Sequence, residues 1–163
     1  MVFSIQESRS NEYLKGESYT FPVLAVDPTG DEDYFWHIIN NGRQPIEIDG
    51  MIVSSTVVGL MSVDRVTGTA AGGQTPVLQV NRRTGAHVLV ENVICATDPD
   101  ITGLTAEGTE EYFHVGVVLE QYRQDFPQPI RLSQGQQLAG LWGEATGVIT
   151  VAIHWRKITE PQN

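Results

Sequence analysis

Near the end of the chain, large apolar side chains recur at every second position. From Ile149 to Trp155, apolar residues occupy every second position, while Thr150, Ala152 and His154 fill the positions between them. This period of two predicts a β-strand with one buried face. Two shorter strands are expected just before it, at 129–132 and 136–142, with a turn of Ser, Gln and Gly at the first joint and a turn bounded by Gly143 and Gly147 at the second. The last quarter of the chain therefore leaves no room for a helix.

Strand-forming residues dominate the rest of the chain as well. The sequence has 18 Val and 14 Thr, while 16 Gly and 8 Pro interrupt every run before a long helix could form. Turns are expected at 27–30, 40–42, 67–73 and 98–100, and residues 102–110 are expected to form a short helix or an irregular loop. The predicted strands cover residues 19–26, 33–40, 46–56, 57–66, 76–80, 86–95, 111–120, 129–132, 136–142 and 148–156.

Many short strands without crossover helices pack most simply as two sheets face to face. The sequence therefore predicts an all-β fold, an antiparallel two-sheet jelly-roll sandwich with an N-terminal arm. At 163 residues the chain is long enough for one well-buried domain, expected at 18–158, with the arm at 1–17 and a C-terminal tail at 159–163. Gly59 interrupts the 46–66 segment, which is expected to be two strands joined by a bend or one strand that changes sheets.

The charge of the chain argues against nucleic acid as a partner. There are 20 acidic and 10 basic residues, giving a net charge of −10, and a surface this acidic repels phosphate backbones. The adjacent basic pair Arg82-Arg83 is expected at an exposed hairpin tip. No apolar run reaches the length of a membrane span, and the residues after Met1 do not read as a signal peptide. We expect no membrane partner.

No catalytic, cofactor-binding or metal-binding residue is predicted, and the chain is not expected to be an enzyme. Cys95 lies in an apolar run and is expected to be buried. The glycine-rich 67–73 segment lacks the lysine of a phosphate loop. The carboxylates at 31–33, 98–100 and 110–111 match no calcium-loop spacing. The four histidines, which form no His-x-His motif of the cupin type, are His37, His87, His114 and His154.

Aromatic and apolar side chains supply the candidate contact residues. Trp36 and Trp155 alternate with aliphatic residues and are expected in the core. The 122–128 segment is expected to be an exposed loop that carries aromatic rings. The predicted interface residues, from the arm and from this loop, are Val2, Phe3, Ile5, Tyr122 and Phe126.

Several segments resemble those of a known group of proteins. They are the run from Asp33 to Gly42, the Pro45-Ile-Glu-Ile segment, the run from Val66 to Pro76 followed by Asn81-Arg82, and the strands from Leu138 to Trp155. In these segments, which span roughly 32–155, the chain resembles small proteins encoded in the structural gene clusters of tailed phages. That group resembles capsid decoration, or cement, proteins, which form jelly-roll trimers on the outside of the head.

The resemblance implies a non-enzymatic structural role. A homotrimer would bind the major capsid protein on the exterior of the virion, after assembly in the host cytoplasm. Two alternatives remain open at this point. The first is a carbohydrate-binding or receptor-binding module of a phage tail or fibre, and the second is a cupin-like enzyme, which would need a bound metal ion.

Overall fold

Two antiparallel β-sheets make up the fold in the computed structural model, which describes residues 17–30, 33–71 and 74–158. The predicted contact residues Val2, Phe3 and Ile5 lie outside these ranges. No helix is present in the described residues. The strands are β1 (Ser18–Val26), β2 (Asp33–Asn40), β3 (Ile46–Ser55), β4 (Gly59–Ala71), β5 (Thr75–Pro76), β6 (Gln79–Asn81), β7 (His87–Val88), β8 (Val93–Val115), β9 (Tyr122–Leu132), β10 (Gln137–Trp142) and β11 (Ile149–Lys157).

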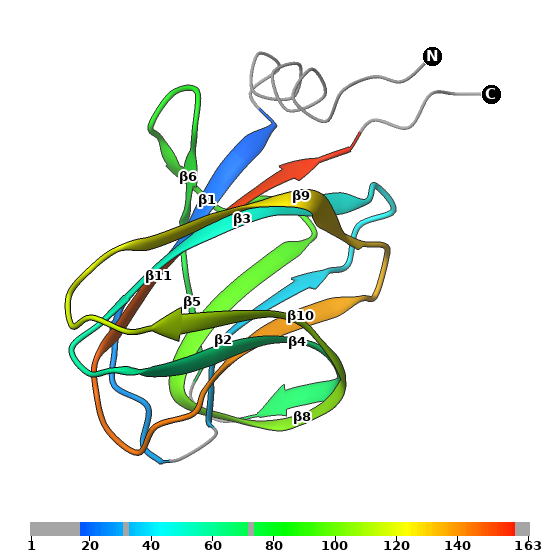
Figure 1. Ribbon diagram of the computed structural model, residues 1–163. Helices are drawn as coiled ribbons and strands as arrows, with labels where there is room; N and C mark the ends of the chain where they lie inside the picture. Colours follow the sequence, from blue (N-terminus) through cyan, green and yellow to red (C-terminus); the bar gives the residue numbers. More distant parts are fainter. Residues whose placement is uncertain (1–16, 31–32, 72–73, 159–163) are drawn as a thin grey trace.

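The predicted two-sheet sandwich is confirmed. We call the sheet with the order β7-β6-β1-β11-β3-β9 sheet A, and the sheet with the order β2-β10-β4-β8-β5 sheet B. The long strands alternate between the two sheets along the chain, except that β4 and β8 are neighbours in sheet B. This order is consistent with a jelly roll. Figure 1 shows the two layers, with β3 and β9 in one and β4 and β10 in the other.

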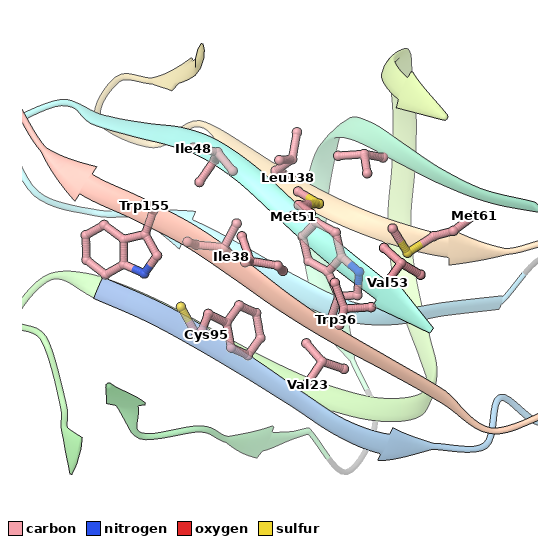
Figure 2. Close-up of a cluster of buried hydrophobic side chains, with 14 of the residues drawn as sticks. Val23, Trp36, Ile38, Ile48, Met51, Val53, Met61, Cys95, Leu138 and Trp155 are labelled. Carbon is pink, nitrogen blue, oxygen red and sulfur yellow. The ribbon is translucent and has the colours of Figure 1, made fainter. Parts of the chain in front are cut away.

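The core lies between the inner faces of the two sheets. Its largest side chains, Trp36, Trp142 and Trp155, are fully buried, which confirms the expectation for Trp36 and Trp155. The expected burial of Cys95 is also confirmed, since it is 2% exposed. Figure 2 shows side chains of β2, β3, β8 and β11 converging in this cluster. Alternation of apolar residues along each strand therefore places one face of each sheet in the core.

Strand β8 closes sheet B on itself. Its first part pairs with β2, up to the Tyr34–Ile101 pair, and its second part pairs with β4, from the Ala71–Thr102 pair onward. The β4–β8 ribbon bends where Gly68 and Gly103 meet, with φ angles of +100° and +80°. A Cβ on Gly68 would lie 2.3 Å from the carbonyl oxygen of Gly103, so the bend requires glycine. Figure 1 shows the resulting curvature of β8.

Several local predictions fail around this long strand. The expected turn at 98–100 and the expected helix or loop at 102–110 are wrong, because both segments belong to β8. The turn at 67–73 is wrong for its described residues 67–71, which continue β4. The predicted strands at 76–80 and 86–95 are each interrupted, and the predicted strand at 111–120 ends at Val115. Proline and glycine mark turns in isolation, but pairing on both sides of β8 overrides that local preference.

Other boundaries agree closely with the sequence. The predicted strands at 19–26, 33–40, 136–142 and 148–156 correspond to β1, β2, β10 and β11 within one residue at each end. The bend at Gly59 is the start of β4, where the chain crosses from sheet A to sheet B. Arg82 and Arg83 are exposed in the β6–β7 hairpin, as expected. These are the segments where alternation and turn residues agree.

Candidate interaction surface

An apolar tip lies at one end of the sandwich. It is formed by the β3–β4 turn, the first residues of β4, and the β8–β9 loop. Soluble domains seldom gather large apolar side chains in solvent at one place without a partner for them. The residues that define the tip, with their exposed fractions, are Val58 (50%), Leu60 (41%), Val117 (56%), Val118 (46%) and Leu119 (70%).

Hydrogen bonds donated by backbone amides fix the β8–β9 side of the tip. The amide of Leu119 donates to the carbonyl oxygen of Ser55 over 2.8 Å, which ties the loop to the end of β3. The amide of Val117 donates to the hydroxyl oxygen of Tyr122 over 2.7 Å. Leu119 has a φ of +61°, in the left-handed region that costs a leucine free energy. The loop thus holds the Leu119 side chain in solvent at an energetic cost.

The β3–β4 side of the tip is anchored to the start of β11. The amide of Thr56 donates to the carbonyl oxygen of Val148 over 3.0 Å, and the amide of Val148 donates to the hydroxyl oxygen of Thr56 over 2.9 Å. Val57 is half-buried and packs against Gly147. A Cβ added to Gly147 would lie 2.3 Å from Cγ2 of Val57. Both sides of the tip are therefore held in place by contacts with the sandwich.

Two carboxylates lie beside the tip. Glu120 follows Leu119 directly and accepts a hydrogen bond of 3.3 Å from the hydroxyl of Tyr122. The Cγ of Glu144 would lie 2.5 Å from a Cβ on Gly59, so this side chain borders the β3–β4 turn. Anionic headgroups would be repelled by these charges, so the tip is better suited to an apolar protein surface than to an anionic membrane.

A buried carboxylate in sheet B is satisfied by hydroxyl groups. Asp64 is 4% exposed, and its Oδ2 accepts hydrogen bonds from the hydroxyls of Tyr34 over 2.9 Å and Ser62 over 3.3 Å. Its Oδ1 accepts from Thr109 over 2.8 Å. Burial, the hydrogen bond to Asp64 and the charge of Asp64 together raise the pKa of Tyr34. The donors come from β2, β4 and β8, so this group joins the strands of the closed sheet.

A buried arginine joins two strands of sheet A. Arg156 is 2% exposed; its Nη1 donates to Oδ1 of Asp49 and its Nη2 to Oε2 of Glu47, each over 2.5 Å. Opposite charges at this depth compensate one another, and loss of one partner would leave an uncompensated charge. This cluster is therefore explained by the stability of the sheet.

The histidines are distributed over separate parts of the fold. His37 is buried on sheet B, where burial lowers its pKa more than hydrogen bonds to Gln137 and Gln74 raise it. His154 lies on the outer face of sheet A, with its Nδ1 2.9 Å from the hydroxyl oxygen of Thr20. His87 and His114 are exposed. Among the described residues, no group of three or more His, Cys, Asp or Glu side chains could hold a metal ion.

The predicted aromatic loop is a strand. Residues 122–128 belong to β9, and Phe126 is 3% exposed, with its ring centroid 6.2 Å from that of Phe113. The expectation that Phe126 is exposed is therefore wrong, because the alternation of β9 turns this ring into the core. Tyr122 is half-buried, and its role as an interface residue stays a prediction. Sequence reasoning missed the tip, since 111–120 was expected to continue as one strand.

Comparisons with known proteins add no family assignment. No protein-family model matches the chain, and no curated protein matches its sequence. In the part of the chain that the structure describes, no helix has the length and apolar character needed to cross a membrane.

Proposed function

We propose that this chain is a non-enzymatic structural protein, a decoration protein that binds the outside of a tailed-phage head as a homotrimer. The observation that carries the proposal is the apolar tip. The partner is the major capsid protein, and the site of action is the capsid exterior. The resemblance of the sequence to decoration proteins supplies the identity of the assembly, while the tip supplies a surface for attachment.

The tip supports attachment because it is both apolar and held in place. Burying Leu119 and its neighbours against a partner removes apolar surface from water, and the loop is already ordered before binding. Each copy presents one tip, so a trimer presents three to a symmetric lattice. Linked contacts of this kind raise the overall affinity by about 10²-fold or more when the geometry lets them bind together.

The first experiment measures attachment with and without the tip. We expect the double substitution Val118→Ser and Leu119→Asn to reduce co-sedimentation with tailed-phage heads by about tenfold or more, because apolar burial is lost. Asn tolerates the left-handed backbone at 119, so the fold is retained. Leu89→Asn is the matched control, since Leu89 is 72% exposed and lies outside the tip. Equal binding by the double variant and the control would contradict the proposal.

The second experiment measures the oligomeric state. Light scattering of the purified chain is expected to give the mass of a trimer. A mass of one chain, together with no co-sedimentation with heads, would exclude the proposed role.

A depression beside β9 favours the alternative of a carbohydrate-binding module. Its volume is about 320 Å³, and Tyr112 at its rim is 57% exposed. His114, Tyr122 and Gln124 also line it, so a ring for stacking and polar groups for hydroxyls meet at one place. Binding on a glycan array that Tyr112→Ala abolishes, with no binding to heads, would favour this alternative.

A further inference from the structure

A pocket of about 420 Å³ lies on sheet B, away from the tip. Its lining comes from β2, β10, the bent part of β4, β5 and the first part of β8. This volume falls within the range of roughly 300–1,000 Å³ typical of small-molecule sites. The side chains that matter for its chemistry are His37, Gln137, Ile39, Ala70, Pro76 and Ile94.

The polar groups of the pocket are held by hydrogen bonds. Oε1 of Gln137 lies 2.8 Å from Nε2 of His37, and Nε2 of Gln137 donates to the carbonyl oxygen of Gly68 over 3.0 Å. These two contacts fix the orientation of the amide, so the Nε2 of His37 is the donor toward Gln137. The second hydrogen of the Gln137 amide is left to donate to a ligand. His37 is 5% exposed and gives this polar group a rigid base.

The walls of the pocket are uncharged and mostly apolar. Ile39, Ala70, Pro76 and Ile94 supply aliphatic surface, and none of the described residues that line the pocket is Asp, Glu, Lys or Arg. Burial lowers the pKa of His37, so the imidazole is neutral at pH 7. A charged ligand would lose hydration here without gaining a counter-charge. A neutral ligand meets no such penalty.

We propose that this pocket binds a small neutral amphiphile, with a carboxamide or hydroxyl group against Gln137 and a short aliphatic chain lying over the cross-strand pair Ile39 and Ile94. Stacking on a sugar ring is not its mode of binding, because the described lining residues carry no Tyr, Trp or Phe. Amphiphiles of this type match the few polar groups and the apolar walls that small-molecule sites combine. The inference is independent of the proposed function, because the tip does not contribute to the pocket.

The experiment uses the full chain labelled with ¹⁵N and hexanamide as the probe. Hexanamide is expected to produce saturable shifts of the Gln137 side-chain amide in ¹H–¹⁵N spectra. Hexanoate and hexylamine have the same chain length but carry a charge, so each is expected to bind about tenfold or more weakly. Ile94→Trp should abolish the shifts by filling the pocket. This substitution is compatible with folding, since Ile94 is 48% exposed.

Leu89→Trp is the matched control, because it adds the same ring at a residue that is 72% exposed and outside the pocket. The control is expected to keep the hexanamide shifts. The absence of saturable shifts, equal shifts with hexanoate, or shifts that survive Ile94→Trp would each overturn the inference. None of these outcomes bears on attachment to phage heads, which the tip variants test separately.

Discussion

The hydroxyl of Tyr34 donates a hydrogen bond of 2.9 Å to Oδ2 of Asp64, reaching from β2 to β4 across the strand β10 that lies between them. Ala139 of β10 is fully buried in the same small cluster and has no side chain long enough to block this contact. The bond therefore fastens two strands of the closed sheet that do not pair with each other. It also satisfies part of a carboxylate that is otherwise costly to bury.

We predict that Tyr34→Phe lowers the free energy of unfolding by about 1–3 kcal/mol, because Asp64 then loses one of its donors in a buried place. Urea denaturation at pH 7 measures the change. Tyr112→Phe is the control, since Tyr112 is 57% exposed, and it is expected to leave the midpoint unchanged. The same loss for both variants would show that the bond to Asp64 is not the cause.

Gly140→Ala is expected to destabilise the fold by about 1–3 kcal/mol or more, because overpacking of a dense core displaces its neighbours. A Cβ at this position would lie 1.9 Å from Nε1 of the fully buried Trp36. Gly108→Ala provides the comparison, since a Cβ there would meet no atom within 4 Å. Chemical denaturation followed by tryptophan fluorescence measures both. A stable Gly140→Ala variant with an unchanged emission spectrum would contradict the packing at Trp36.

The free energy of unfolding is expected to decrease as the pH is lowered, in part because of His154. Burial, followed by the charges of Arg82 and Arg123, lowers the pKa of His154 from its ordinary 6.5 to about 4, although Asp125 opposes the shift. The unfolded chain therefore binds a proton at His154 more readily than the folded chain does. The contribution of His154 to stability is complete above pH 6.5 and is lost as the pH falls toward 4.

Urea denaturation between pH 4 and 7 tests this expectation on the wild-type chain and on His154→Gln. The variant should lose less stability over this range. Burial also lowers the pKa of His37, so protonation of His37 likewise reduces stability as the pH falls. This effect is common to the wild-type chain and the variant. Identical pH profiles for the two proteins would count against the expected shift at His154.

Leu119→Asn is expected to raise the free energy of unfolding by up to about 1 kcal/mol, because it relieves a left-handed leucine. Val118→Asn serves for comparison, since Leu119 but not Val118 is among the residues with positive φ. Thermal unfolding of both variants measures the difference. A loss of stability at 119 equal to that at 118 would show that the backbone at Leu119 is not strained.

The sequence predicted those strands whose signal is local. In β2, β10 and β11, alternation and flanking turn residues agree, and the structure places them within one residue of the predicted bounds. Strand β8 could not be predicted in the same way. Pro99, Gly103 and Gly108 mark breaks by their local preferences, whereas pairing of one strand with both β2 and β4 depends on residues far away in the chain.

The apolar tip could not be predicted from the sequence for the same reason. Val117, Val118 and Leu119 have the composition of a strand interior, so the predicted strand at 111–120 placed them within it. In the structure the chain leaves the sheet after Val115, and the apolar residues that follow turn outward. The prediction for Phe126 is wrong in the opposite direction. An aromatic residue between glutamines and prolines suggests exposure, whereas its position in β9 directs the ring into the core.

The pairing of β1 with β11 has a practical consequence for engineering. Ser18 lies opposite Arg156, and the amide of Lys157 donates to the carbonyl oxygen of Glu17 over 3.0 Å, so both ends of the sandwich domain leave it side by side. The tip lies at the other end of these strands, about 27 Å away for nine residues of β11. A reporter or antigen joined directly before Glu17 or after Ile158 would start on the side remote from the tip, which makes the fold a candidate scaffold for display.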